Sequence, residues 1–224
     1  MITARLQCII NHVCGETIAD IGTDHAYVPV RLIEEKRAEK IIASDIRKGP
    51  VETARRTVKR HKMEDKIEIR QGAGLSVLKP GEADNIIIAG MGGILISEII
   101  NNDMETAKES FLILQPMNCQ YELRKYLHQN GFSIIDEDIA TEGFKVYNLF
   151  TVKKGVQQPF LNDIDYHLPP NLYNHRLFNA LYEKKKREFT KVIKGLENSK
   201  QKDIEKLNRY RQWYDDLKKI KQNV

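Results

Sequence analysis

Short apolar runs alternate with amphipathic stretches over the first two thirds of the chain. Seven of the runs have the length and composition of β-strands, at residues 17–21, 40–45, 66–71, 85–90, 110–115, 132–140 and 146–152. Amphipathic stretches between them predict helices at residues 27–36, 50–61, 94–101 and 120–130. This alternation predicts an α/β fold with a seven-stranded, doubly wound sheet.

The last two predicted strands break the alternation. No helical stretch separates residues 132–140 from residues 146–152, so we expect an antiparallel pair at the end of an otherwise parallel sheet. Strand–helix units followed by a terminal hairpin are the order of elements in Rossmann-like class I methyltransferases. A dinucleotide dehydrogenase usually continues to alternate.

The pattern changes after Val152. Residues 153–171 contain three prolines and few periodic apolar positions, which predicts a linker or an extended arm. Beyond them, two stretches with apolar spacings of three and four, joined by a polar turn at residues 198–200, predict two helices packed as an antiparallel coiled coil. The seam positions are Phe178, Tyr182, Lys185, Phe189, Val192 and Leu196, then Ile204, Leu207, Arg211, Tyr214 and Leu217. We therefore expect a catalytic domain at 1–155, and a linker with a coiled-coil domain at 156–224.

The composition is that of a folded protein with one substantial core, since 41% of the 224 residues are hydrophobic and 30% are charged. No apolar run approaches the roughly 20 residues of a membrane-spanning helix. The N-terminus lacks the features of a signal peptide, so a cytoplasmic location is expected. Cys8, Cys14 and Cys119 lack metal-binding spacing, so we expect reduced thiols and no metal site.

The net charge of +5 is unevenly distributed. Residues 160–224 hold 15 Lys and Arg against 9 Asp and Glu, a net of +6, whereas the preceding residues have a net of −1. The basic character therefore belongs to the C-terminal helices, where it favours contacts with nucleic-acid phosphates. The basic run at residues 184–187 has a simpler alternative as a solvated helix face.

The loop after the first predicted strand combines one glycine with two carboxylates. Gly22 allows a ligand to approach the backbone closely, and the helix that follows offers N–H donors. Asp20 and Asp24 would repel a pyrophosphate, which disfavours a dinucleotide. They favour a cationic ligand such as S-adenosylmethionine, which carries an ammonium and a sulfonium.

Further loops follow the other parallel strands and converge on the same edge of the sheet. Asp45 ends the second strand, at a position suited to bind both hydroxyls of a ribose. The loop at residues 71–75 suits backbone contacts with an adenine, and the glycine-rich loop at residues 89–93 is where a transferred group would meet its acceptor. Gln115 and Asn118 supply amide groups beside the same crevice.

Each of these residues also has a purely structural alternative. Asp24 could cap the following helix, His25 could cap or pack, and Asp45 could be a surface turn residue. Gly92 and Gly93 could be purely structural, because glycines are common in tight strand–helix connections. Residues interpreted as outside the site are Asp84, at a strand start, and Lys145 and Tyr147, on an edge strand.

Five segments together carry a resemblance to a known family. In chain order they are DIGTDHAYVPV, ASD, GAGL, IAGMGG and LQPMN. With the C-terminal helical pair, they resemble the bacterial tRNA (adenine-22-N1)-methyltransferase family over nearly the whole chain. The resemblance implies a class I catalytic domain that uses S-adenosylmethionine to methylate N1 of an adenine in the D-arm region of tRNA.

The loop positions and the resemblance together give a set of expected cofactor contacts. They are Asp20, Gly22, Thr23, Asp24, His25, Tyr27, Asp45, Gly72, Ala73, Gly74, Leu75, Ala89, Gly90 and Met91. Family members often carry an acidic or amide residue where this chain has Ala73. We expect backbone groups of residues 72–75 to replace the contact which that side chain makes with the adenine amine.

The chemistry at N1 of adenine needs alignment above all, because N1 has an in-plane lone pair. Oxygen atoms near the cationic product would stabilise the transition state. The expected catalytic residues are Gly90, Met91, Gly92, Gln115 and Asn118. The base must first be turned out of its pairing. We expect a monomer whose coiled coil, with Tyr210, Arg211, Trp213 and Tyr214 near its end, holds tRNA by phosphate contacts and shape.

Two other functions stay open at the level of the sequence. One is a class I methyltransferase for a small molecule or a protein, with the helical tail used for oligomerisation. The other is a tRNA-binding module with a vestigial cofactor pocket, which Ala73 favours.

Overall fold

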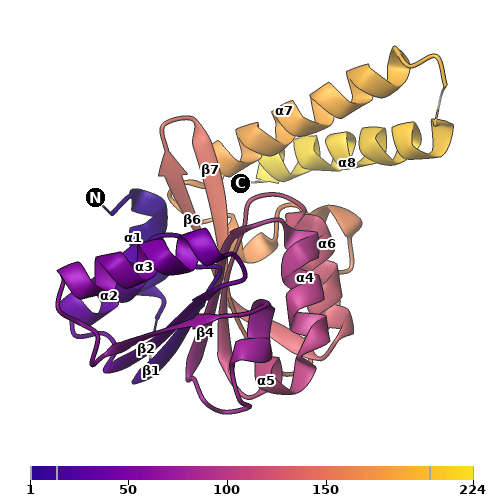
Figure 1. Ribbon diagram of the computed structural model, residues 1–224. Helices are drawn as coiled ribbons and strands as arrows, with labels where there is room; N and C mark the ends of the chain where they lie inside the picture. The colour runs from indigo at the N-terminus through magenta and orange to yellow at the C-terminus, as the bar shows by residue number, and fades with distance from the viewer. Residues whose placement is uncertain (1, 14, 202, 224) are drawn as a thin grey trace. The chain divides into compact units, whose positions relative to one another are not determined.

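The computed structural model describes residues 2–13, 15–201 and 203–223 (Figure 1). The chain divides into two compact units, Met1–Gln158 and Pro159–Val224. No helix among the described residues is long and apolar enough to cross a membrane. The roles expected of the two domains, cofactor binding and tRNA contact, stay predictions.

The first unit is built on a seven-stranded sheet with the order β3-β2-β1-β4-β5-β7-β6. The strands are β1 (Thr17–Ile21), β2 (Lys40–Asp45), β3 (Ile67–Gln71), β4 (Asn85–Met91), β5 (Phe111–Pro116), β6 (Phe132–Glu142) and β7 (Lys145–Lys154). The first five are parallel to their neighbours, whereas β7 is antiparallel to both β5 and β6. This topology confirms the predicted doubly wound sheet with a terminal antiparallel pair.

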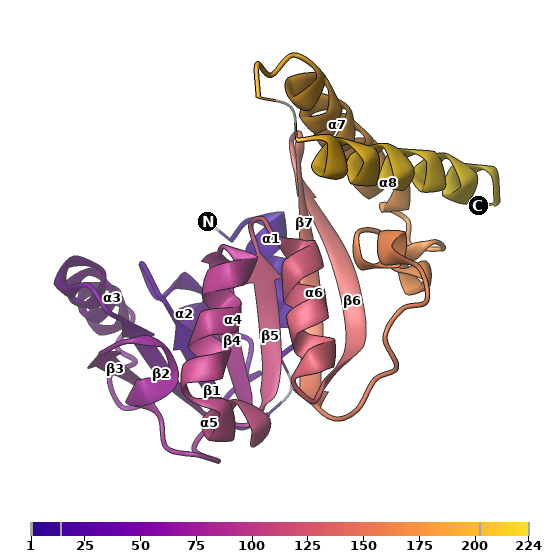
Figure 2. The ribbon, with the colours of Figure 1, turned by 90° about the vertical axis from the view of Figure 1, so that its right-hand side faces the viewer.

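Helices cover both faces of this sheet (Figure 2). One layer holds α1 (Ala4–Asn11), α2 (Tyr27–Glu34) and α3 (Lys48–Arg60), and the other holds α4 (Gly93–Asn102), α5 (Met104–Lys108) and α6 (Gln120–Gln129). In β4, Ile87 packs in the first core, whereas Ile86 and Ile88 pack in the second. Burial on both faces explains why the strands read as nearly continuous apolar runs.

Several elements differ from the sequence predictions. Helices α1 and α5 were not predicted. Strand β7 lies between β5 and β6, so the edge-strand interpretation is wrong for its place in the sheet. Its pairing with β5 covers only residues 150–152, however, and Lys145 and Tyr147 pair with β6 alone. Asp84 does act at a strand start, because its Oδ2 accepts the backbone N–H groups of Glu16 and Thr17, each at 2.8 Å.

The predicted linker is more folded than its prolines suggested. Residues 163–172 form two 3₁₀ turns, Asp163–Tyr166 and Pro170–Leu172, in the second unit. Leu168 is fully buried and Leu172 is 1% exposed. The linker interpretation is therefore wrong for this half of the segment, whose apolar side chains pack without a helical period.

Two long helices, α7 (Phe178–Glu197) and α8 (Ile204–Asn223), pack together in the second unit. The predicted seam is wrong at two positions of α8, because Ile204 and Arg211 are exposed while Trp213 and Ile220 are buried. Trp213 donates its indole N–H to Asp163 Oδ2 at 2.8 Å, which draws it inward. Lys185 is also buried, beside Glu188, so the basic run at residues 184–187 is not a uniformly solvated face.

Candidate active site

Two cavities of about 500 and 550 Å³ open at the carboxyl ends of the parallel strands. Asp20, Gly22, Thr23, Asp24, His25, Tyr27, Asp45, Ala89, Gly90 and Met91 line the first cavity. Gly22, Asp45, Gly72, Ala73, Gly74 and Met91 line the second. Three of these residues, Gly22, Asp45 and Met91, border both cavities, so the expected cofactor residues surround one divided crevice. Leu75, Gly92, Gln115 and Asn118 line neither cavity.

Asp20 is a buried carboxylate in the lining of the first cavity. It is 8% exposed and lies one residue before the end of β1, the strand between β2 and β4. Burial raises its pKa from 3.8 to about 6, and a hydrogen bond from the Thr23 side chain opposes that rise. A carboxylate that is buried at such a cost favours a cationic ligand group, which would restore part of its lost solvation.

The loop after β1 is shaped by its backbone. Gly22 has a φ of +81°, in the left-handed region, and the N–H groups of Gly22 and Thr23 both donate to the Ser44 carbonyl at 2.8 Å. Asp24 does not cap α2, because the N-cap is Ala26, which makes no side-chain capping bond. Asp24 instead lies 3.2 Å from His25 Nε2.

His25 and Tyr27 form an aromatic wall of the first cavity. Their rings stack with centroids 5.1 Å apart at an angle of 14°. Tyr27 is 44% exposed and opens helix α2. These two rings provide a flat surface in the lining of the cavity.

Asp45 stands at the border between the two cavities. The N–H and Nε groups of Arg47 both donate to its Oδ1, at 2.7 and 3.3 Å. Because both of these bonds reach Oδ1, the Oδ2 atom suits a ligand hydroxyl in the adjoining cavity. The side chain is 6% exposed, which is not the setting of a surface turn residue.

The second cavity has walls suited to a flat apolar group. Gly72, Ala73 and Gly74 form one side, and the exposed side chains of Ile46 and Leu95 border the same space. Gly74 has a φ of +53°, which a larger residue would adopt only with strain. Leu75 is fully buried in the core, so it supports this loop from below.

Two residues at the junction of β4 and α4 have different roles. Met91, the last residue of β4, lines the site, whereas Gly93, the first residue of α4, packs against the backbone behind it. Met91 borders both cavities, and a Cβ placed on Gly22 would lie 2.0 Å from Met91 Cε, so the glycine makes room for this methionine. A Cβ on Gly93 would lie 2.3 Å from the Cys119 carbonyl oxygen. Gly93 is thus needed for close backbone packing, and its N–H donates to the Asn118 carbonyl at 3.0 Å.

Arg5 is one of the site residues that were not expected from the sequence, as is Arg47. It lines the first cavity, and its Nη1 donates to Gln115 Oε1 at 2.8 Å. Its guanidinium also lies over the Tyr147 ring, 5.7 Å from the centroid. Gln115 is buried and does not line the cavity, but it accepts a hydrogen bond from Arg5, which does. Arg5 belongs to α1, which the sequence analysis did not predict. The sequence signal for this helix was a capping Thr3 followed by Leu6, Ile9 and Ile10 at helical spacing.

The strand order and the acidic, divided crevice at the carboxyl ends of the strands define a class I methyltransferase fold. A family model described as "Methyltransferase domain" matches residues 2–150, and the chain belongs to this methyltransferase family.

The tRNA (adenine(22)-N(1))-methyltransferase of Bacillus subtilis is 40% identical over 157 residues, which are 69% of this chain and 66% of that enzyme. The chain thus aligns with just under two thirds of that relative's length in sequence. The crystal structure of the B. subtilis m1A22 tRNA methyltransferase TrmK has a TM-score of 0.87 at 29% identity, covering 98% of each chain.

A structure from Streptococcus pneumoniae, a putative tRNA (m1A22) methyltransferase in complex with S-adenosyl-L-methionine, is also similar. Its TM-score is 0.86 at 29% identity, and the match covers 98% of this chain and 99% of that one. These similarities confirm the family resemblance that the five sequence segments carried.

Proposed function

We propose that this chain is an S-adenosylmethionine-dependent methyltransferase that methylates N1 of adenine 22 in tRNA. The proposal rests above all on the buried Asp20 carboxylate, which lines a crevice whose two cavities share Asp45 and Met91. The similarity to tRNA (adenine(22)-N(1))-methyltransferase supports the choice of base and position. We further propose that the enzyme acts as a monomer on the D-arm region.

The residues of the crevice fit each part of the cofactor. Asp20 suits the ammonium, Asp45 Oδ2 suits the ribose hydroxyls, and the loop of Gly72 to Gly74 suits the adenine. Bound S-adenosylmethionine supplies a methyl group on a sulfonium. Ala73 has no polar side chain, so we propose that backbone groups of its loop bind the adenine amine.

The target base has to reach the first cavity, on the other side of Met91. Ala89 and Gly90 line this part, and the stacked rings of His25 and Tyr27 border it. N1 attacks through its own lone pair, so these groups act by positioning the base. Backbone carbonyls of Gly90 and Met91 would stabilise the positive charge that develops on the adenine. Arg5 holds Gln115 at the edge of this space, so we propose a positioning role for Gln115.

A basic stripe on α7 supports contact with tRNA. Arg187, Lys191 and Lys194 are exposed and follow at spacings of four and three, on one face of the helix. Among the described residues, none of the three takes part in an ion pair, in contrast to Lys218 and Lys219 of α8. Trp213 is buried, so we do not include it among the residues proposed to contact tRNA, although the sequence had suggested it.

Removing the charge of this stripe should weaken tRNA binding. For the triple variant Arg187→Gln, Lys191→Gln and Lys194→Gln, we expect affinity to fall at least about tenfold. The slope of log affinity against log salt should become shallower by about 2–3, since each phosphate contact contributes about 0.7–0.9. The measurement is filter binding of an unmodified tRNA transcript at several salt concentrations, with cofactor binding followed by calorimetry.

The matched control is Arg209→Gln, Lys218→Gln and Lys219→Gln, which removes the same charge from cations that already have acidic partners. We expect this control to keep most of the wild-type salt slope, and both triple variants to bind S-adenosylmethionine normally. Equal losses in both variants would mean that only net charge matters. Salt-independent binding by the wild type would favour a small-molecule or protein substrate, and absence of cofactor binding would favour the vestigial-pocket alternative.

A further inference from the structure

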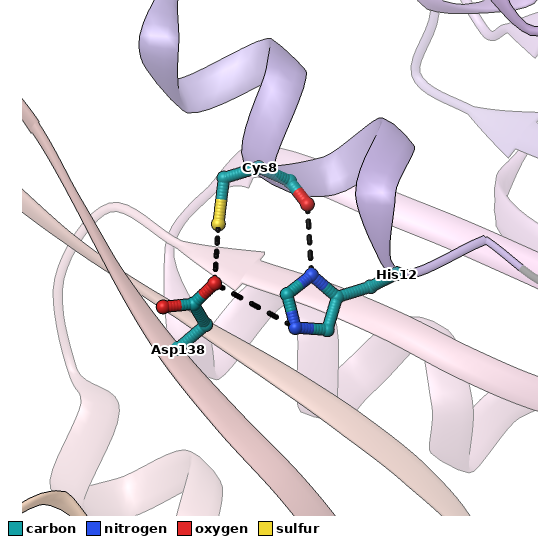
Figure 3. Close-up of side chains that lie close together, drawn as sticks. All are labelled: Cys8, His12 and Asp138. Atoms are coloured by element: carbon teal, nitrogen blue, oxygen red, sulfur yellow. Dashed lines mark hydrogen bonds and ion pairs between the residues drawn. The ribbon is translucent and has the colours of Figure 1, made fainter. Parts of the chain in front are cut away.

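A separate group of side chains joins helix α1 to strand β6. Cys8 and His12 stand four residues apart, at the end of α1, and both point toward Asp138 of β6 (Figure 3). Cys8 Sγ is 3.4 Å from Asp138 Oδ2, and His12 Nε2 is 3.7 Å from the same oxygen. None of the three residues lines either cavity. We propose that Cys8, His12 and Asp138 bind a zinc-class divalent cation.

Two of the three distances between the ligand atoms are close to those of a tetrahedral metal site. The sulfur, nitrogen and oxygen atoms all lie within 4.8 Å of one another. Zinc bonds of about 2.3 Å to sulfur and about 2.0–2.2 Å to nitrogen and oxygen give ligand–ligand edges of about 3.4–3.6 Å in a tetrahedron. The two measured edges, 3.4 and 3.7 Å, are therefore close to those of an occupied site.

His12 is oriented as a metal-binding histidine is. Its Nδ1 lies 2.8 Å from the Cys8 backbone carbonyl oxygen, and because a carbonyl only accepts, Nδ1 carries a hydrogen. Nε2 then faces Asp138 and, at 3.3 Å, Asp136. An Nδ1–H group bonded to a carbonyl is the arrangement that directs Nε2 to a metal.

The surroundings favour a positive charge at this point. Alternate residues of β6 point to opposite faces, so Asp136 and Asp138 face α1 while Glu137 faces Arg124 of α6. The carboxyl end of α1 adds its own negative partial charge. Cys8 forms no disulfide, so its sulfur is chemically suited to ligation as a thiolate.

A cation here would fasten α1 to the sheet. Cys8, His12 and Asp138 would give three protein ligands and leave a fourth position, near Asp136, for a water. Binding would release the thiol proton of Cys8 to solvent. The same helix carries Thr3 and Arg5 into the first cavity, so the cation would steady one wall of the crevice without touching it.

Cobalt(II) is the probe that tests this site, because it takes zinc's place and gives visible spectra. We expect untagged wild-type protein to bind one equivalent of Co²⁺, with tetrahedral d–d bands and a thiolate-to-cobalt charge-transfer band. Zn²⁺ should displace the Co²⁺. In Cys8→Ser the charge-transfer band should vanish and affinity should fall at least about 100-fold, since loss of an outer-shell partner alone costs about 10–100-fold.

Cys119→Ser is the matched control, because it removes a thiol that lies outside the cluster, and it should keep the band and the affinity. His12→Gln, a second ligand variant, should lose the affinity while its thermal melt in the absence of metal stays cooperative. Binding without a charge-transfer band, a band that survives Cys8→Ser, or no binding at one equivalent would overturn the proposal. The cluster would then be only a hydrogen-bonded set of thiol, imidazole and carboxylate.

Discussion

Asp20→Asn should reduce methyl transfer at least about 100-fold while making the unliganded protein more stable. Removing one member of a buried charge pair with a ligand costs about 2–5 kcal/mol of binding, so the affinity for S-adenosylmethionine should fall by about the same factor. The amide is nearly isosteric with the carboxylate, so the shape of the crevice is kept. Calorimetric titration and initial-rate measurements give the two quantities.

The stability gain follows from the raised pKa of Asp20. The pKa is about 6 in the folded state against 3.8 in the unfolded state, so the folded protein binds the proton more tightly. Stability from this group is fully present below pH 3.8 and is lost as pH rises through about 6. Above that pH the ionised carboxylate destabilises the fold by about 3 kcal/mol, as an order of magnitude.

The asparagine variant should therefore melt higher than wild type at pH 8, and by less at pH 5. The exposed Asp65→Asn is the matched control, and it should change neither activity nor stability by a measurable amount. A variant that is inactive and also less stable at pH 8 would contradict the account, because inactivity would then reflect damage to the fold and not the loss of a ligand charge.

Arg124→Met should lower the free energy of unfolding by about 3–5 kcal/mol, because it leaves the Glu137 carboxylate buried without its cation. The two side chains are 0% and 2% exposed and meet at 2.6 Å between Nη2 and Oε2. The guanidinium also lies 4.5 Å from the centre of the Phe150 ring. This pair holds α6 to β6 on the face opposite α1. Urea denaturation followed by circular dichroism measures the change.

The double variant Arg124→Met with Glu137→Leu should recover most of that loss, since no buried charge remains and apolar groups fill the space. This rescue separates the cost of an unpaired charge from the cost of poor packing. If the double variant is as unstable as the single one, packing around the guanidinium accounts for the effect. A loss below about 1 kcal/mol in the single variant would be the size expected of an exposed pair, and would contradict burial.

The carboxyl ends of the parallel strands could be predicted because periodicity locates the strands and topology brings their ends together. This is why Asp20, Asp45 and Ala73 were expected near one another, and the structure has all three in the linings of the two cavities. Gln115 differs because its direction depends on the register of β5 and on Arg5, a contact across 110 positions. No local pattern encodes such a contact.

The same limit applies to the helices and to the cysteines. In α8 the apolar spacing did not decide whether Arg211 or Trp213 faces α7. The hydrogen bond from Trp213 to Asp163, in the 3₁₀ turn at Asp163–Tyr166, favours burial of Trp213. Cys8 lacks cysteine partners at metal spacing, so the sequence predicted no metal site. Its acidic neighbour Asp138 lies 130 positions away, and only the fold brings the two together.

Transfer of a labelled methyl group from S-adenosylmethionine to unmodified tRNA transcripts is the most direct test of the proposed reaction. Transcripts with adenine 22 and with guanine at that position should be compared, using wild-type protein and the Asp20→Asn variant, and the labelled nucleoside identified. We expect 1-methyladenosine from the adenine-22 transcript with wild type alone, and no label in the guanine transcript. Label in another nucleoside, equal labelling of both transcripts, or no labelling by a wild-type protein that binds the cofactor would contradict the proposed reaction.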